Sequence, residues 1–520
     1  MNLLQRIGLG IFFIGFGLWI YTLSLNEFKL TEAIVQKNLK PEHQATLGQR
    51  LQPMLNQTYG NSWLFSYNFD QILSRLNNEY KAKKEWDKVI YDEYSFNITK
   101  ASATGTLAQN PFLWFLLTFG LASLGGLLYF TQDLKTLPGI KNNGIFHNSA
   151  TARGWVGAAF GTFLIGFYVL LYYFPQYLAN WTLLVDPLSK ALNGGPASRW
   201  FLYGTLYTFS VLVMGIRMLI KYRHSRYQQV RTGSVMFFQT TFAFIVPEIL
   251  VSLNKPYFDF KNMWPLKYDF FFDYNINNLI QGGGLGIFML VWGIVLFVVG
   301  VPVMTYFFGK RWYCSWVCGC GGLAETLGDP FRQLSDKSLK AWKIERYLIH
   351  GVLVLAVFMT SLVLYTYFTG QSRFLFLDSY QIRSAYGFWI GSIFAGVIGT
   401  GFYPTMGSRV WCRFGCPLAA YLGWWQRKKS QFRITTNGGQ CISCGNCSTY
   451  CEMGIDVRAY AQRGQDIVRS SCVGCGVCSS VCPRGVLNLE NLSEGSRVMI
   501  APEVLMGNEM PSYRTKITNS

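Results

Sequence analysis

The residues CISCGNCSTYC at 441–451 and CVGCGVCSSVCP at 472–483 repeat one cysteine pattern twice. In each copy three cysteines are separated by two residues, and a fourth follows after three more. Three thiols spaced in this way wrap a short loop around one compact group. The fourth thiol lies too far along the chain for the same group and reaches across to a second one.

This spacing is that of a two-cluster bacterial ferredoxin, and it predicts two [4Fe–4S] clusters and one-electron transfer. Zinc is the main alternative because CxxC also suits tetrahedral zinc, but zinc ribbons use two pairs of ligands and each run here has four. Disulfides are a further alternative. The expected ligands of one cluster are Cys441, Cys444, Cys447 and Cys482, and those of the other are Cys472, Cys475, Cys478 and Cys451.

The composition indicates an integral membrane protein. Of 520 residues, 50% are hydrophobic and only 14% are charged, whereas soluble domains carry about 25% charged residues. A spanning helix needs about 20 apolar residues. We therefore expect an all-α membrane bundle of about eight spans, followed by a cytoplasmic α+β ferredoxin-like domain. The expected spans are 7–26, 111–132, 154–178, 200–220, 232–252, 282–308, 347–369 and 385–406.

These spans divide the chain into regions. The first is interpreted as a retained anchor, because no small-residue cleavage site of a signal peptide follows it. The predicted regions are an anchor (1–26), an extracytoplasmic segment (27–110), spans 2–5 (111–252), an extracytoplasmic aromatic loop (253–281), spans 6–8 (282–429), the ferredoxin domain (430–490) and a tail (491–520). For the segment 27–110 we expect a role in docking a partner or in packing within the protein. Nine of the nineteen residues 256–274 are aromatic, which favours a belt at the membrane surface over the wall of a quinone pocket.

Basic residues predict the orientation. Lys and Arg concentrate in the loops after spans 4, 6 and 8, and such loops face the cytoplasm. Both termini and the ferredoxin domain are then cytoplasmic. The net charge of +19 serves attraction to anionic lipids rather than nucleic-acid binding, because the basic residues flank helices. All thirteen cysteines fall on the reducing side of the membrane, where thiols persist.

A second repeat lies at the ends of spans 6 and 8. GKRWYCSWVC at 309–318 and GSRVWCRFGCP at 407–417 share an arginine, flanking aromatics and a CxxxC pair at an offset of 98 residues. Spacing of i and i+4 predicts that each pair shares one helical face. Four thiols brought together in this way suit a third cluster, copper or zinc, or dithiol cycling; small buried side chains are the structural alternative. The cysteines concerned are Cys314, Cys318, Cys412 and Cys416, with Cys320 as a fifth candidate.

Positive charge beside these cysteines predicts that their thiols ionise easily. Lys310 and Arg311 precede the first pair and Arg409 precedes the second. Nearby positive charge lowers a cysteine pKa. We therefore expect thiolates in this region.

Tandem CxxxC motifs followed by a two-cluster ferredoxin with Cys-x-Met-Gly-Ile-Asp at 451–456 resemble the membrane polyferredoxin family. That family includes NapH, NosR and NirI of denitrifying respiration and the oxidase-assembly protein CcoG. The resemblance covers roughly residues 285–490. It implies an inner-membrane electron-transfer component that serves a respiratory or metal-cofactor system, with the eight ferredoxin cysteines and the two CxxxC pairs as its site residues.

Electrons need a further carrier to cross the membrane. We expect no haem, because the chain has four histidines, only His350 lies in a span and no CxxCH occurs. The bilayer core is about 30 Å thick, so a quinone, a flavin or a partner's cofactor must bridge it. Glu248 in span 5 is a candidate catalytic proton acceptor for quinol, or else it caps a helix end or pairs with a loop lysine.

Two functions follow. The first is electron transfer between a cytoplasmic or quinone donor and a respiratory partner enzyme, which would make the protein a subunit of a quinol dehydrogenase if quinol is the donor. The second is an assembly factor that reduces a metal or a disulfide during maturation of a respiratory metalloenzyme. The sequence favours the first.

Overall fold

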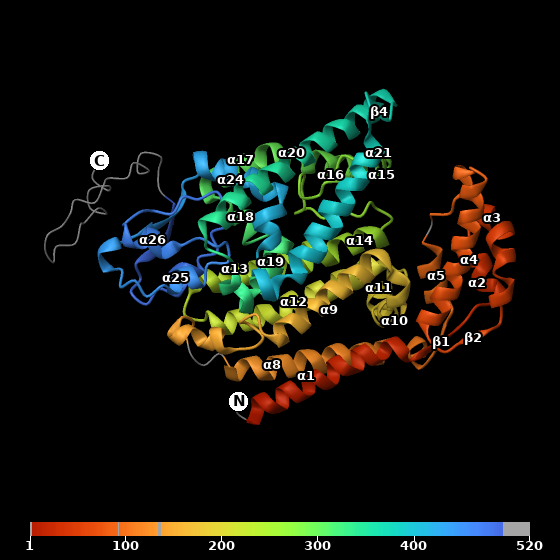
Figure 1. Cartoon of the computed structure of the whole chain (residues 1–520), viewed down its shortest axis with the longest axis horizontal. Coiled ribbons are helices and arrows are strands. Elements are labelled where there is room, and N and C mark those ends of the chain that lie inside the picture. The colour runs from red at the N-terminus through yellow and green to blue at the C-terminus, as the bar shows by residue number, and fades with distance from the viewer. Residues whose placement is uncertain (1–2, 92, 134–136, 492–520) are drawn as a thin grey trace. The chain divides into compact units, whose positions relative to one another are not determined.

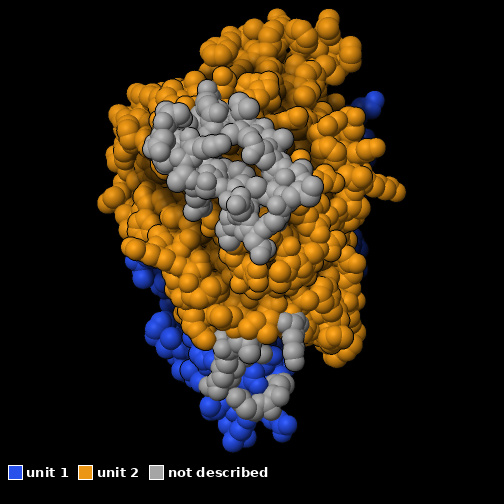
Figure 2. Space-filling model, turned by 90° about the vertical axis from the view of Figure 1, so that its left-hand side faces the viewer, with its two compact units in different colours: residues 1–133, 167–207 blue, residues 134–166, 208–520 orange. Residues whose placement is uncertain are grey.

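The structure is a computed structural model, which describes residues 3–91, 93–133 and 137–491. The chain divides into two compact units (Figure 2). Unit 1 comprises residues 1–133 and 167–207, and unit 2 comprises residues 134–166 and 208–520. Apart from Asn491, the predicted tail 491–520 lies outside the described residues.

Seven helices in the described part of the chain are long and apolar enough to cross a membrane. The chain is therefore a multi-pass membrane protein, mostly helical as predicted. The seven are Leu3–Ser24, Pro111–Thr131, Trp155–Tyr173 (α9), Arg199–Lys221 (α12), Arg226–Ser252, Gly283–Phe308 and Leu339–Thr369 (α20).

The expected eighth span, 385–406, is not among these seven candidates. The chain is helical there, but the helix changes its winding twice. Tyr268 packs against Gly387 and Gly391, where an added Cβ would meet tyrosine atoms at 3.1 and 2.9 Å, and the wider π-helical turns lie at this contact. The segments are α21 (Ser379–Tyr386), η11 (Gly387–Ile398) and α22 (Gly399–Gly401).

Unit 1 contains a close helix pair. Helix α1 (Leu3–Tyr21) lies along α8 (Leu121–Asp133) (Figure 1). A Cβ on Gly125 would lie 2.3 Å from the backbone nitrogen of Phe12, and one on Gly15 would lie 2.5 Å from that of Ala122. Glycines at these positions allow the two backbones to approach, which is how helices commonly associate in membranes.

The polar segment of unit 1 folds around a small sheet. Its antiparallel strands have the order β2 (Thr58–Tyr59), β1 (Asn26–Lys29), β3 (Ala103–Gly105). Helix α4 (Ser62–Ala82) begins where Asn61 accepts a hydrogen bond from the backbone of Leu64 at 2.8 Å, an N-cap. Phe65 and Phe69 are buried in its core. The other helices are α2 (Glu32–Asn38), α3 (Pro41–His43), α5 (Tyr94–Ala101), α6 (Thr106–Gln109), α7 (Pro111–Phe115), α10 (Ala179–Leu184) and α11 (Asp186–Asn193).

Unit 2 holds the helices that carry the cysteine motifs. Span 226–252 consists of α13, η8 and α14, and span 283–308 consists of α16, η9 and α17. The elements are α13 (Arg226–Phe237), η8 (Phe238–Ile245), α14 (Val246–Ser252), α15 (Asp273–Gln281), α16 (Gly283–Val295), η9 (Leu296–Gly300), α17 (Val301–Phe308), α18 (Arg311–Cys314), α19 (Gly319–Glu325), η10 (Asp329–Leu334), α23 (Tyr403–Met406), η12 (Trp411–Gly415) and α24 (Pro417–Lys429).

The aromatic loop 256–274 enters the bundle, so its interpretation as a belt at the membrane surface is wrong. Trp264 donates a hydrogen bond from Nε1 to Oγ1 of Thr360, 2.9 Å away in α20. Its ring lies edge-on to Phe297 at 4.6 Å. Met263 is buried in the core that also contains Cys314. Irregular backbone at membrane depth is tolerated where protein surrounds it, and the aromatic side chains provide that packing.

The C-terminal cysteine region contains short helices and a two-stranded sheet, as the α+β prediction requires. Strand β6 (Phe432–Thr436) pairs antiparallel with β7 (Leu487–Asn491). Gly445 and Gly476 have φ of 81° and 71°, a conformation that favours glycine. Each lies directly before a short helix that carries a cysteine. The helices are α25 (Asn446–Thr449), α26 (Val457–Gln462) and α27 (Val477–Ser480).

Candidate iron-sulfur sites

Two cavities divide the eight C-terminal cysteines into two sets of four. In both, the fourth cysteine of one run joins the first three of the other run. Cys441, Cys444, Cys447 and Cys482 line the first cavity, and Cys451, Cys472, Cys475 and Cys478 line the second.

The separation of the cysteines around these cavities suits a group larger than one ion. Zinc–thiolate bonds of about 2.3 Å bring four sulfurs tightly together. Among the described residues, no three His, Cys, Asp or Glu side chains converge as ligands of one metal ion do. All thirteen cysteines are free thiols. The donor set, four thiols around each cavity, fits a [4Fe–4S] cluster.

Side chains from the preceding helices and loops hold the backbone around the second cavity. Gln228 donates to the carbonyl of Cys475 at 2.8 Å, and Tyr227 donates to that of Gly474 at 2.8 Å. Ser315 donates to the carbonyl of Val473 at 2.8 Å. The cysteine region is therefore bound directly to the elements at the ends of the spans.

The two CxxxC motifs form one buried cluster of thiols. Cys314, Cys318, Cys412 and Cys416 are all buried and lie close enough to affect one another's ionisation, and the partly buried Cys320 hydrogen-bonds to Cys318. The expected shared helical face does not bring them together. Helix α18 ends at Cys314, Cys318 precedes α19, and Cys416 caps α24.

The two copies of the 98-residue repeat instead share the same backbone turns. The backbone N–H of Cys318 donates to the carbonyl of Tyr313 at 2.8 Å, and that of Cys416 donates to the carbonyl of Trp411 at 2.9 Å. Gly309 and Gly407, also 98 residues apart, have φ of 68° and 93°, which glycine adopts at little cost. These glycines turn the chain from the preceding helix into each motif.

Burial controls the ionisation of these thiols. It raises the pKa of Cys314 to about 12 and also raises the pKa of Cys412, because a charged sulfur is poorly solvated there. Lys310 and Arg409 lower both values but do not outweigh burial, so the expectation of easily ionised thiols is wrong for these two. A hydrogen bond from Cys320 lowers the pKa of Cys318 to about 6. A bound metal would deprotonate thiols at this site.

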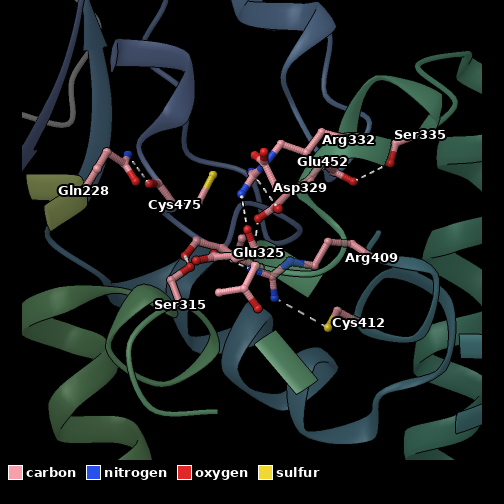
Figure 3. Close-up of polar contacts among 12 residues, drawn as sticks. Gln228, Ser315, Glu325, Asp329, Arg332, Ser335, Arg409, Cys412, Glu452 and Cys475 are labelled. Carbon is pink, nitrogen blue, oxygen red and sulfur yellow. Dashed lines mark hydrogen bonds and ion pairs between the residues drawn. The ribbon is translucent and has the colours of Figure 1, made fainter. Parts of the chain in front are cut away.

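A buried network of ion pairs, which was not predicted from the sequence, connects the two cysteine sites (Figure 3). Arg409 lies at its centre. Its Nη1 is 3.7 Å from the sulfur of Cys412, and its Nη2 is 2.9 Å from a carboxylate oxygen of Glu452. Glu452 directly follows Cys451, which lines the second cavity. One side chain therefore contacts the CxxxC cluster and the residue next to a ferredoxin cysteine.

The rest of the network contains more basic groups than acidic ones. Arg332 pairs with Glu452 at 2.8 Å and with Asp329 at 2.7 Å, and Lys221 pairs with Asp329 at 2.7 Å. Arg409 also pairs with Glu325. Burial raises the pKa of Glu452, but the neighbouring arginines outweigh it and hold that pKa below its usual range. The basic members are Arg217, Lys221, Arg231, Arg332 and Arg409, and the acidic members are Glu325, Asp329 and Glu452.

Two features of the sequence point to this network in retrospect. Glu325 and Asp329 are acidic residues in a loop rich in Lys and Arg, and Glu452 follows a cysteine. Excess positive charge between the two sites suits anionic thiolate-bound groups, because opposite charge offsets the cost of burying them.

Glu248 lies in α14, partly buried. Its carboxylate is close enough to Tyr257 to raise the pKa of that phenol, although burial is the larger cause. Glu248 lines neither of the cavities described above. Its catalytic role stays a prediction.

Comparison with known proteins identifies both cysteine regions. Residues 290–338 and 386–434, the two copies of the membrane repeat, each match the family model described as a 4Fe-4S binding domain. Residues 433–483 match the model described as a 4Fe-4S dicluster domain. This is a multi-pass membrane protein with 4Fe-4S domains.

The chain is also 27% identical over 159 residues to YccM of Escherichia coli (strain K12), whose name describes an electron transport protein. The aligned region is 28% of this chain and 43% of YccM, so the chain spans less than half of that relative. No solved structure matches the chain significantly.

Proposed function

We propose that this protein is an electron carrier of a bacterial inner membrane. It passes electrons between a cytoplasmic or quinone donor and a respiratory partner enzyme, as a member of the membrane polyferredoxin family. The two C-terminal sets of four cysteines hold one [4Fe–4S] cluster each. Cys314, Cys318, Cys412 and Cys416 hold a third.

The observation that carries this proposal is the Arg409 bridge. Arg409 contacts the sulfur of Cys412 at 3.7 Å and the carboxylate of Glu452 at 2.9 Å. It leaves no room for bulk solvent between the two sites, because Arg409, Cys412 and Glu452 are all buried. When bound, iron–sulfur clusters supply one-electron chemistry at potentials set by charge, hydrogen bonds and exposure. Here the chain's own residues determine the charge, the hydrogen bonds and the solvent exposure around the cysteines.

The orientation belongs to the same proposal. Ser315 and Lys310 bond to the cysteine region from the segment after span 283–308, and Gln228 does so from the first turn of α13. The basic-residue rule assigns both of these places to the cytoplasmic side. The termini and the ferredoxin domain are then cytoplasmic. This side of the membrane also keeps thiols reduced.

One observation favours the assembly-factor alternative. The membrane cluster of thiols has five members, one more than a cubane needs, and Cys320 hydrogen-bonds to Cys318. A spare thiol beside a metal site is suited to handing over a metal or reducing a disulfide.

A deletion strain separates the two functions. We expect the partner respiratory enzyme to keep its full metal content and to lose only its electron supply when this gene is deleted. Metal analysis of the purified partner, together with its activity on an artificial donor, measures both properties. A partner that lacks metal and stays inactive with the artificial donor would favour the assembly factor instead.

Substitution of Glu248 tests whether quinol is the electron donor. Glu248→Gln keeps the shape of the side chain and removes the proton acceptor. If quinol is the donor, the rate of quinol-driven cluster reduction falls about 100-fold, within the range that general base catalysis contributes, while reduction by dithionite is unchanged. Glu42→Gln, at an exposed carboxylate, is the control. An unchanged quinol rate would return Glu248 to a structural role.

A further inference from the structure

A third cavity lies in unit 2 at the start of helix α20. Trp342 and Arg346 line it from α20, and Lys310 and Arg413 line it from the two copies of the membrane repeat. Cys412 and Ser471 also line the cavity.

The lining carries positive charge that the chain does not fully neutralise. Lys310, Arg346 and Arg413 are basic, and Glu345 is the acidic residue among the lining residues. Glu345 pairs with Nε of Arg413 at 2.7 Å. An anion inside the cavity would therefore find a net positive environment of low dielectric, where opposite charges attract strongly.

Arg413 provides a second, independent sign of a ligand. Its side chain is buried, with a relative exposure of 3%. Nε bonds to Glu345 and Nη1 donates to the carbonyl of Asp336 at 2.7 Å. Nη2 is buried and has no hydrogen-bond partner among the described residues. Buried donors are rarely left unsatisfied, and a ligand oxygen in this cavity would satisfy this one.

The mouth of the cavity lies on a membrane span. Arg346 and His350 are both exposed, one helical turn apart on α20. The guanidinium of Arg346 lies 5.5 Å from the centre of the Trp342 ring. Tryptophan and basic residues at the end of a span are typical of the headgroup region, and basic pockets between spans on the cytoplasmic side bind anionic headgroups.

We propose that this cavity binds the phosphate of an anionic phospholipid headgroup. Arg346 attracts the headgroup at the rim, and Lys310 and Nη2 of Arg413 donate to its phosphate oxygens inside. Binding does not depend on the proposed electron transfer. The cavity also touches Cys412 and Met453, which follows Glu452. A phosphate bound there places negative charge between the two cysteine sites.

Lipid retention by the purified full-length protein tests the proposal. The protein is exchanged into nanodiscs of phosphatidylcholine that contain a small fraction of phosphatidylglycerol, and bound lipid is counted by native mass spectrometry. We expect preferential retention of phosphatidylglycerol. Arg346→Gln lowers it about fivefold, the effect of one positive charge near a lipid surface. Lys343→Gln is the matched control, because Lys343 is an exposed base on the same helix and does not line the cavity.

A measurement with inorganic phosphate shows whether the bound phosphate group belongs to a lipid headgroup or to free phosphate. If the headgroup is the ligand, phosphate alone at millimolar concentration leaves the retained phosphatidylglycerol in place. Phosphate that binds with the same sensitivity to Arg346→Gln, without retained lipid, would overturn the lipid as ligand. Equal retention of phosphatidylglycerol and phosphatidylcholine by the wild type would also overturn the proposal. So would an equal loss of bound phosphatidylglycerol in Arg346→Gln and Lys343→Gln. A quinone that copurifies with the wild type and is absent from Arg346→Gln would show that the cavity binds quinone instead.

Discussion

In the double variant Cys314→Ser/Cys412→Ser, the iron content of the anaerobically purified protein falls from about twelve to about eight atoms per chain, because three cubanes become two. Each substitution removes one thiolate from a different copy of the repeat, so a cluster shared by the copies loses half of its ligands. The rate of electron transfer to the partner falls by more than about 100-fold, because substitution of residues that only support metal ligands already lowers metal affinity or activity by about 10–100-fold. Iron and sulfide analysis with low-temperature EPR measures the first effect.

The fifth thiol provides the control for this experiment. Cys320→Ser makes the same chemical change in the same core, but Cys320 lies outside the 98-residue repeat, and a serine hydroxyl can also donate its hydrogen bond to Cys318. We expect it to keep about twelve irons, four for each of three cubanes. Eight irons in the wild type, or unchanged iron in the double variant, would contradict a shared cluster. Zinc in place of iron would contradict the ferredoxin assignment as well.

Replacing Arg409 by methionine is expected to lower the free energy of unfolding by about 3–5 kcal/mol, the usual cost of removing one partner from a buried ion pair. The variant leaves Glu325 and Glu452 buried with fewer positive neighbours. Because Glu452 lies beside Cys451, the cysteine region should also exchange backbone hydrogens faster. Denaturation in detergent and hydrogen exchange measure these two effects.

Arg311→Met is the matched control, because Arg311 occupies the equivalent position in the first copy of the repeat. Its guanidinium lies 4.4 Å from the centre of the Phe432 ring and bonds to Asn491 at an exposed site. The hydrogen bond at the exposed site contributes about 1 kcal/mol or less, and the cation–π contact with the buried Phe432 ring contributes about 2 kcal/mol at most. Equal destabilisation in the two variants would show that the buried network has no special importance for holding the cysteine region.

The sequence predicted the elements whose signals are local. Apolar stretches of about 20 residues identify spans without tertiary information, since each span must satisfy its own backbone. Seven of the eight expected spans correspond to candidate membrane helices. The π-helical winding within 385–406 was not predicted, because it lies where Tyr268 packs against Gly387 and Gly391, which are distant from Tyr268 in the sequence.

The loop 256–274 shows where composition misleads. Its aromatic residues suit a membrane surface and a packed core equally well. Trp264 reaches Thr360 and Phe297, and only the arrangement of those helices decides between the two environments. The CxxxC pairs show the same limit, because an i,i+4 spacing does not reveal that α18 ends at Cys314.

By itself the sequence determined the two ferredoxin-type runs, the 98-residue repeat and the membrane spans, because ligand spacing along a short loop and apolar length are local properties. The tertiary structure alone decided that Arg409 connects Cys412 to Glu452 and that the thiols of the two CxxxC pairs lie close together. It also decided that burial, rather than the neighbouring bases, controls the thiol of Cys314. Contacts between residues this far apart depend on how the helices pack, and solvation depends on what surrounds a side chain in space.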